Sequence, residues 1–177
     1  MVKKIVIFFA YLSFFILALI YFTPKVSAYY FLETQLKKYD LIISSETPID
    51  SGLSFNIQNA TVVFKSIESA EIENINIKIF GLYNRVRVDN IELSSAVASF
   101  VPTKVSSVEI CYHVIDPIHI NAKVVGEFGT AEAVVDILER SVHLKLLPSA
   151  VMSKEYGHTL KNLKKSEDGE FVYDKTF

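Results

Sequence analysis

The sequence predicts a mainly β protein, in which an N-terminal transmembrane helix precedes a curved antiparallel meander sheet with one or two short helices. Two observations predict this architecture. The chain begins with an uncharged apolar stretch, Ile5 to Phe22, and from about residue 40 apolar and polar residues alternate one by one. Such alternation is typical of strands with one buried and one solvated face, and turn residues interrupt it about every 8–12 residues.

Residues 1–25 form the predicted cytoplasmic tip and membrane anchor. As a helix rising about 1.5 Å per residue, the apolar stretch is roughly 27 Å long, near the ~30 Å thickness of a hydrocarbon core. Lys3 and Lys4 precede it, so the positive-inside rule places the N-terminus in the cytoplasm and the remainder outside. We expect the anchor side chains to include Ile5, Phe8, Phe15, Leu19 and Phe22.

A cleaved secretory signal is the alternative to a retained anchor, because Val26-Ser27-Ala28 resembles a small-residue cleavage site after Ala28. The apolar stretch is longer than the roughly 7–15 residues of a usual signal core, which favours retention. Both alternatives place the β-rich domain, residues 40–177, outside the cytoplasm. The chain has one cysteine, so no intrachain disulfide is expected there.

A short juxtamembrane helix is predicted between the anchor and the sheet, over residues 26–39. Tyr29, Leu32 and Leu36 recur there at spacings of three and four, which is the period of a helix with one apolar side. We expect this helix to pack over one end of the sheet.

The alternation defines the strands of the sheet. Leu53, Phe55 and Ile57 lie on one face, and comparable runs continue to about residue 147. After the sheet we expect a helix over residues 150–165 and a last short strand from Glu170 to Tyr173. Eight or nine strands are therefore expected, with breaks predicted at Ser51-Gly52, Gln58-Asn59, Gly81, Pro102 and Asp116-Pro117.

The sequence contains no motif of an enzyme that we recognise. It has no Gly-x-Ser-x-Gly elbow, no His-Glu-x-x-His pair and no glycine-rich phosphate loop. Glu71 and Glu73 share a strand face, but acids spaced by two are routine on a solvated face. We therefore expect a non-enzymatic protein with no catalytic residues and no cofactor.

A three-ligand metal site is conceivable in the hairpin that contains Cys111, His113 and His119. Cys111 and His113 share a strand face, whereas the side of His119 depends on the turn. A two-residue loop points His119 to the opposite face and a three-residue loop points it to the same face, and both remain open. Because structural zinc usually takes four ligands, we expect polar side chains of a solvated face and no metal.

Charge distribution gives a second candidate and excludes one class of partner. Arg85 and Arg87 are spaced to grip a phosphate or carboxylate, and the alternative is ion pairing with Asp89 or Glu92 across a hairpin, which we favour. The formal net charge of the chain is −2, and the first 25 residues hold three lysines and no acid. The exported domain is therefore more acidic still, which argues against nucleic acid as a partner.

Two stretches of the sequence give it a family resemblance. A span and short helix followed by "LIISSETPIDSGLSFNIQNATVVF", and then "IENINIKIFGLYNRVRVDNIELS", resemble AsmA-like proteins, in particular the small inner-membrane protein N of type II secretion systems. "LKLLPSA" and "GEFVYD" resemble the end of the same group. The resemblance implies an inner-membrane protein of a Gram-negative envelope, with a curved sheet in the periplasm whose apolar face forms an open groove. It brings no catalytic residues.

The expected function is that of an accessory or assembly subunit of an envelope machine such as a type II secretion-like system. Its partners would be the inner-membrane bilayer and other envelope proteins, met by strand addition or an apolar patch. The alternative is a lipid-binding or lipid-transfer module with phospholipid as its partner. Its candidate apolar groove is formed by Leu53, Phe55, Ile57, Ile75, Ile77, Ile79, Val86 and Val88.

Overall fold

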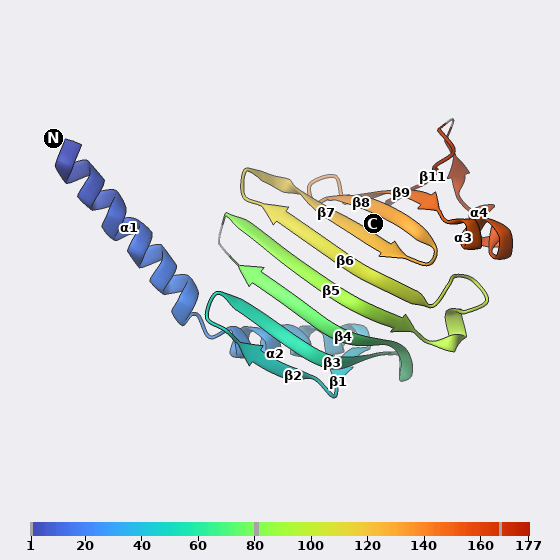
Figure 1. The fold of residues 1–177 in the computed structure, drawn as a ribbon, viewed down its shortest axis with the longest axis horizontal. Helices are drawn as coiled ribbons and strands as arrows, with labels where there is room; N and C mark the ends of the chain where they lie inside the picture. Colours follow the sequence, from blue (N-terminus) through green and yellow to red (C-terminus); the bar gives the residue numbers. More distant parts are fainter. Residues whose placement is uncertain (1, 80–81, 167) are drawn as a thin grey trace.

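The computed structural model describes residues 2–79, 82–166 and 168–177. It has one open antiparallel sheet of eleven strands, an apolar helix at the N-terminus and a few short helices (Figure 1). The predicted fold class is therefore confirmed. No second sheet packs on the first among the described residues, and the short helices cover only parts of one face of the sheet.

Two helices precede the sheet. Helix α1 (Val2–Phe22) projects away from the rest of the molecule, and Pro24 separates it from α2 (Lys25–Leu36) (Figure 1). A single 3-10 turn, η1 (Lys37–Tyr39), follows, and Asp40 ends it with a left-handed φ of 58°. The helix expected over residues 26–39 is therefore present, and only Thr23 and Pro24 separate it from α1.

The sheet is a meander through most of its width. From β3 to β9 each strand pairs antiparallel with its neighbour in sequence, and β11 then pairs with β9. Strands β1 and β2 pair with the two halves of β3 and form one edge, and β10 pairs with β11 at the other. The strands are β1 (Leu41–Ser44), β2 (Thr47–Asp50), β3 (Ser54–Phe64), β4 (Ile67–Ile79), β5 (Tyr83–Leu93), β6 (Lys104–His113), β7 (Asp116–Gly126), β8 (Gly129–Asp136), β9 (Ser141–Pro148), β10 (Lys164–Lys165) and β11 (Phe171–Thr176).

Several predicted strand boundaries are wrong. The eleven strands exceed the expected eight or nine because the edge strands β1, β2 and β10 are only two to four residues long and show little alternation. Asp116 begins β7 instead of forming a turn, and the β6–β7 turn lies at Val114-Ile115. The last strand is Phe171–Thr176, displaced from the predicted Glu170–Tyr173. The predicted break at Gly81 lies outside the described residues.

The predicted helix over residues 150–165 is also wrong. Two short helices are present, α3 (Ala150–Glu155) and α4 (Gly157–Leu160), and a further 3-10 turn, η2 (Ser95–Val97), lies between β5 and β6. Ser149 caps α3 by accepting a hydrogen bond from the Met152 backbone N–H at 3.1 Å. Helix α3 ends at Glu155 with Tyr156 as its C-cap, and Lys164–Lys165, after α4, joins the sheet.

A crease crosses four neighbouring strands, and it overturns one predicted turn. Gln58-Asn59 lies inside β3, where Asn59 has a left-handed φ of 55°, and Asn90 in β5 has a φ of 54°. Where the crease crosses each strand, two successive apolar residues of the inward face are three residues apart in the sequence instead of two. These pairs are Ile57/Ala60 in β3, Ile72/Ile75 in β4, Val88/Ile91 in β5 and Val105/Val108 in β6. An extra polar residue in each strand restores the apolar side chains to one face.

Candidate functional site

One face of the sheet is apolar from β3 to β11, because the register aligns inward-facing residues strand after strand. Cross-strand partners share a face, so each aligned row can be followed across the sheet. One row contains Phe55, Ile77, Val86, Ile110, Ala122, Ala133, Leu144 and Tyr173. The next contains Ile57, Ile75, Val88, Val108, Val124, Ala131, Leu146 and Phe171.

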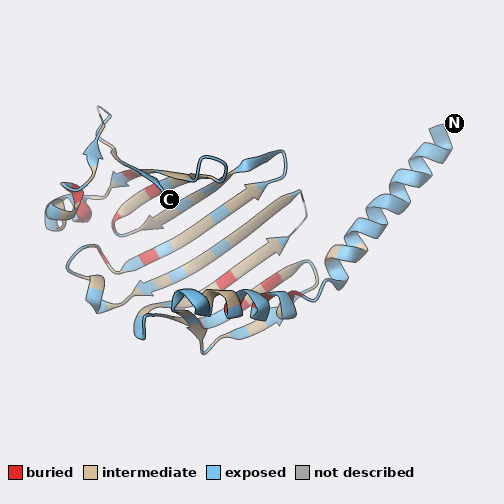
Figure 2. Ribbon diagram, turned by 180° about the vertical axis from the view of Figure 1, so that it is seen from behind, coloured by how far each residue is buried: buried red, intermediate tan, exposed pale blue. Residues whose placement is uncertain are grey.

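Helix α2 covers the β3–β4 end of this face (Figure 2). The ring of Tyr29 lies 5.6 Å from that of Phe55, centroid to centroid, and packs with Ile57, Ala60 and Ile75 into a buried cluster. Ile57 is 1% exposed, which makes it the most deeply buried side chain of the cluster. This end of the face is therefore a small closed core.

Charged groups hold α2 in place over that core. The buried ammonium of Lys25 lies 3.6 Å from Asp50 on β2 and donates to the backbone C=O groups of Tyr21 and Thr23 at 3.4 and 3.3 Å. Burial, together with the Glu46 and Glu33 carboxylates, raises the pKa of Tyr29 far above its ordinary value. The phenol of Tyr29 therefore stays neutral well above the pH at which an ordinary tyrosine ionises.

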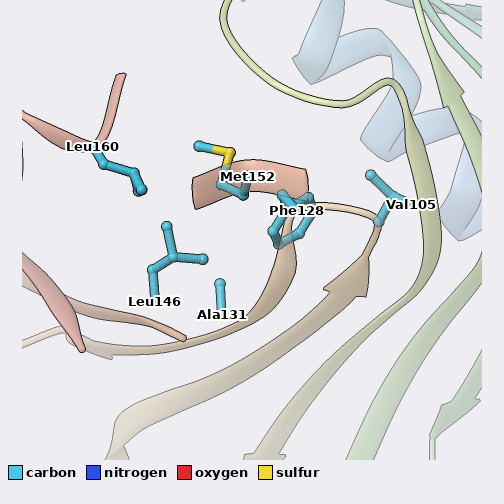
Figure 3. Close-up of a cluster of buried hydrophobic side chains, with 6 residues drawn as sticks. All are labelled: Val105, Phe128, Ala131, Leu146, Met152 and Leu160. Atoms are coloured by element: carbon cyan, nitrogen blue, oxygen red, sulfur yellow. The ribbon is translucent and has the colours of Figure 1, made fainter. Parts of the chain in front are cut away.

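Helices α3 and α4 cover the opposite end (Figure 3). Met152 and Leu160 reach from the helices toward Leu146 on β9, and Phe128 closes the cluster from the β7–β8 turn (Figure 3). Thr159 Oγ1 donates to the Phe100 C=O at 2.7 Å, which ties α4 to the β5–β6 connection. The second cluster is formed by Val105, Phe128, Ala131, Leu146, Met152 and Leu160.

Between the two covered ends, no helix of the described residues lies over the middle of the apolar face on β5, β6 and β7, whereas Val105 near the start of β6 belongs to the second cluster (Figure 2). Val88, Val108 and Val124 remain only half-buried there, and Ile110 is exposed. Val88 belongs to the α2 cluster while its cross-strand partner Val108 packs on the other cluster, so the apolar surface is continuous. We use the name open stripe for the five residues of this uncovered region, which are Val88, Val108, Ile110, Ala122 and Val124.

The eight residues expected to form a groove divide into three groups. Phe55, Ile57 and Ile75 are buried beneath α2, and Ile77, Val86 and Val88 lie half-buried beside them. Leu53, in the β2–β3 turn, and Ile79, at the end of β4, are exposed. Sequence reasoning did not assign Val108, Ile110, Ala122 and Val124 to the groove, although their alternation marks them as members of the same face.

Helix α1 carries the expected anchor residues on an exposed surface. Among the described residues it is the one helix long and apolar enough to cross a membrane, and none of its residues is buried against the sheet. Ile5, Phe8, Phe15, Leu19 and Phe22 are all exposed on it.

On the opposite, polar face, Arg85 and Arg87 have acidic neighbours. Arg87 Nε lies 2.9 Å from Asp89 Oδ1, and Arg87 Nη1 lies 3.7 Å from Glu109 Oε2. Arg85 Nη1 lies 3.9 Å from the other oxygen of Glu109. Asp89 was an expected partner of the two arginines. Glu109 was not expected, because only the register of β5 on β6 identifies it as their neighbour.

The register places Cys111, His113 and His119 on this same polar face. Cys111 pairs with Asn121 and Tyr83 pairs with His113, so His119 lies on the side that a three-residue loop predicts. His119 is nevertheless engaged elsewhere, since its Nδ1 is 2.8 Å from Asp116 Oδ1. The described part of the chain contains no group of three His, Cys, Asp or Glu side chains arranged to hold a metal ion.

A hydrogen bond occupies the thiol of the lone cysteine. The Tyr83 hydroxyl lies 3.4 Å from Cys111 Sγ, and this bond raises the pKa of Tyr83 above its ordinary value. Glu73, the expected partner of Glu71, instead accepts a hydrogen bond from Asn90 Nδ2 at 2.5 Å. The Cys111 thiol in turn donates to Glu109 Oε1 at 3.6 Å, so these polar groups form hydrogen-bonded pairs on the solvated face.

Comparison with known proteins yields no relative: no family model, no curated protein and no solved structure matches this chain.

Proposed function

We propose that this protein is a non-enzymatic, membrane-anchored module that holds the acyl chains of membrane lipid against the open stripe of its sheet. One observation carries the proposal: an apolar face runs across the sheet, and its middle, over β5 to β7, is left uncovered. A protein that docks by strand addition can keep its apolar face covered and present only a sheet edge. The open stripe instead favours a ligand that is itself apolar.

The dimensions of the stripe favour an acyl chain over a whole phospholipid. Strands lie about 4.8 Å apart, so the three strands β5 to β7 together offer an apolar surface about 14 Å wide between the two helical covers. Each methylene group buried there contributes roughly 0.8 kcal/mol. Burial of several methylene groups is therefore enough to hold one segment of an acyl chain, while the lipid headgroup remains in solvent or in the bilayer.

Helix α1 places the sheet beside a membrane, and that membrane is the source of the lipid ligand. It is long and apolar enough to cross a membrane, and Lys3 and Lys4 at its start favour an N-terminus in the cytoplasm. On the resemblance to AsmA-like proteins, we place the anchor in the inner membrane of a Gram-negative cell and the sheet in the periplasm. Lipid transfer away from that membrane is then the process that the stripe serves.

Photocrosslinking tests the proposal on the full chain in proteoliposomes. A phospholipid with a photoreactive group on its acyl chain is activated, and crosslinked peptides are mapped by mass spectrometry. We expect adducts on β5, β6 and β7 in addition to those on α1. Adducts restricted to α1 in a folded protein would show that the stripe does not bind acyl chains.

Two adjacent valines of β7 give a matched pair of variants. Val124 pairs with Val108 and Ala131 on the apolar face, whereas Val125 pairs with Thr130 on the polar face. Val124→Lys places a charge in the stripe and is expected to reduce adducts on β5–β7 several-fold. Val125→Lys adds the same charge on the other face and is expected to leave the adducts unchanged.

A second candidate function, assembly into an envelope machine, is favoured by the edge strand β11. Its partner β10 pairs only with Phe171 and Val172, so among the described residues Tyr173 to Thr176 pair on one side, with β9. An unpaired edge is a template for strand addition by another chain, although Asp174 and Lys175 place charges there. A photocrosslinker at Lys175 is expected to give one discrete protein adduct in native membranes, and one at Lys145 in the interior strand β9 none.

A further inference from the structure

The turns at one end of the sheet carry apolar side chains at their tips. Because the sheet is a meander, the β4–β5, β6–β7 and β8–β9 turns all lie at the same end, and Figure 1 shows this end on the side of α1. Leu82 is 71% exposed, Ile115 93% and Leu138 79%. Val114 and Ile137 beside them are exposed as well. We call these five residues the tip row.

The tip of the β3–β4 turn at the opposite end differs in chemistry. Its two central residues are Lys65 and Ser66, both with left-handed φ values, and the apolar Phe64 and Ile67 flank the turn instead of occupying it. Phe100, in the β5–β6 connection, is an exposed apolar residue of that end, at 58%. Phe100 therefore serves as an internal control for the tip row.

Backbone hydrogen bonds tie each of these turns to the neighbouring turn or strand. The Val114 N–H donates to the Leu82 C=O at 3.0 Å, and the Ile137 N–H donates to the Ile118 C=O at 2.9 Å. Asp136 Oδ1 accepts from the N–H groups of Leu138 and Glu139 at 2.8 and 2.7 Å. These satisfied donors lower the cost of moving the turns out of water, because an unpaired N–H is expensive in an apolar medium.

The end of the sheet that carries the tip row also contacts the membrane helix. A Cβ atom at Gly52, in the β2–β3 turn, would lie 2.3 Å from Cε2 of Tyr21, so the last turn of α1 rests directly on that turn. The ion pair of Lys25 with Asp50 fixes the same junction three residues after α1 ends. This end of the sheet is therefore level with the surface of any bilayer that α1 crosses.

We infer that the tip row inserts into the interfacial region of the bilayer that holds α1, and so fixes the sheet against the membrane at several points. Amphipathic helices in the membrane interface bury their apolar face about 5–10 Å deep in the headgroup and acyl boundary, and we expect a comparable depth for these turns. Glu139 and Arg140, which follow Leu138, carry opposite charges, so the insertion is driven by apolar burial and not by anionic headgroups. Added salt or anionic lipid is expected to change it little. The inference requires α1 in a membrane, and it does not require the open stripe to bind lipid.

Lipid-borne quenching of a fluorophore tests the inference on the full chain in phosphatidylcholine nanodiscs. In a Cys111→Ser background, Ile115→Cys, Leu138→Cys and Phe100→Cys are labelled singly with a small environment-sensitive dye. Phospholipids brominated near the glycerol end of their chains are expected to quench the dye at positions 115 and 138 several-fold more than at position 100. Equal quenching at all three positions in a folded protein would overturn the inference.

A pair of charge variants tests whether the turns act together. With the dye at position 115, Leu82→Asp combined with Leu138→Asp is expected to lower the quenching to the level of position 100. Phe100→Asp is the control, and it is expected to leave the quenching unchanged. If the double variant retains both its circular dichroism spectrum and full quenching at position 115, the tip row does not dock as a unit and the inference fails.

The quenching assay and the photocrosslinking assay, applied to the same variant, separate this inference from the proposed function. Val124→Lys is expected to remove acyl-chain adducts from the open stripe without altering the quenching at position 115. Loss of the stripe adducts with retained quenching is therefore consistent with both proposals. Absence of quenching together with normal stripe adducts would overturn the tip row alone.

Discussion

Gly129 begins β8 with a φ of +118°, in a place where a side chain has no room. A Cβ atom there would lie 2.1 Å from the Leu147 backbone oxygen and 2.7 Å from the Ser149 nitrogen. Since both obstacles are backbone atoms, they cannot rotate away as a flexible side chain does. A glycine is therefore required where the start of β8 pairs with the end of β9.

Gly129→Ala is expected to lower the free energy of unfolding by at least about 1–3 kcal/mol, the cost of a strained backbone position. Chemical denaturation of the full chain in detergent measures it. Gly157→Ala is the control, because nothing lies within 4 Å of a Cβ built at Gly157, the first residue of α4. That change is expected to be neutral or to stabilise by up to about 1 kcal/mol. Equal effects of the two variants would contradict this account.

His119 gives the β6–β7 hairpin a pH dependence. Its hydrogen bond to Asp116, with the Asp116 and Asp136 charges, raises the pKa of the imidazole above its ordinary value. A group whose pKa is higher in the folded protein stabilises it fully below the unfolded-state value of about 6.5, and this stabilisation is lost as the pH rises through the folded value. The charged imidazolium is thus the stabilising form.

Thermal unfolding of the wild type and His119→Gln at a series of pH values tests this sign. The wild type is expected to be the more stable of the two at about pH 6 and to lose that advantage at about pH 8. The difference is small because the site is open to solvent. An NMR titration of Asp116→Asn should show the His119 pKa returning toward its ordinary value. A difference that grows with rising pH would reverse the assignment.

At the scale of the strand, the crease depends on residues that accept a left-handed backbone. Asn59 and Asn90 supply it in β3 and β5, and asparagine is one of the few residues other than glycine that does so readily. The two strands flank Glu73 of β4, which accepts a hydrogen bond from Asn90. The crease is therefore built into the sequence and is not an accident of packing.

Replacement of Asn90 by glycine or valine separates backbone strain from the lost hydrogen bond. Both variants remove the bond to Glu73, but only valine resists a positive φ. Asn90→Val is expected to be less stable than Asn90→Gly by about 1–3 kcal/mol in denaturant unfolding. Asn74→Val in β4, where φ is not positive, is the control and is expected to stay within about 0.5 kcal/mol of wild type. Equal stabilities of the glycine and valine variants would exclude strain as the cause.

At the scale of the molecule, two separate cores support one sheet. The cluster beneath α2 and the cluster beneath α3 and α4 lie at opposite ends, and the half-buried open stripe connects them. Since the stripe contributes less burial than either core, we expect each end to open independently of the other.

Hydrogen exchange measured by mass spectrometry tests this independence. Met152→Ala, which removes about 2–5 kcal/mol of core packing, is expected to speed exchange in β8 and β9 and to leave β3 and β4 unchanged. Ile57→Ala is expected to have the reverse effect. An equal increase throughout the sheet in both variants would mean that the molecule unfolds as a single unit.

Much of the sheet is predictable because its main signal is local. A two-residue alternation such as Ile75, Ile77 and Ile79 identifies a strand and its apolar face without knowledge of any partner. The crease was missed because Gln58-Asn59 has the composition of a turn. Apolar residues three apart, separated by two polar ones, recur in four successive strands, and this repeat was the available signal.

The extent of the candidate site was not predictable in the same way. Whether an apolar face is covered depends on where helices distant in sequence dock, and the alternation of a strand carries no information on this. Lys25 illustrates the difficulty, because its burial is compensated by Asp50, 25 residues later in a different element. The tip row was likewise invisible, since Leu82, Ile115 and Leu138 lie in separate turns that only the topology brings to one end.

The neighbour-by-neighbour strand order has a consequence for biosynthesis. From β3 to β9 each newly made strand finds its partner already in place, so no hairpin waits for a distant segment. Short loops of this kind close at little entropic cost. The sheet can thus form from β3 onward in the order in which the chain is made, and the latest strand is always the edge to which the next strand pairs.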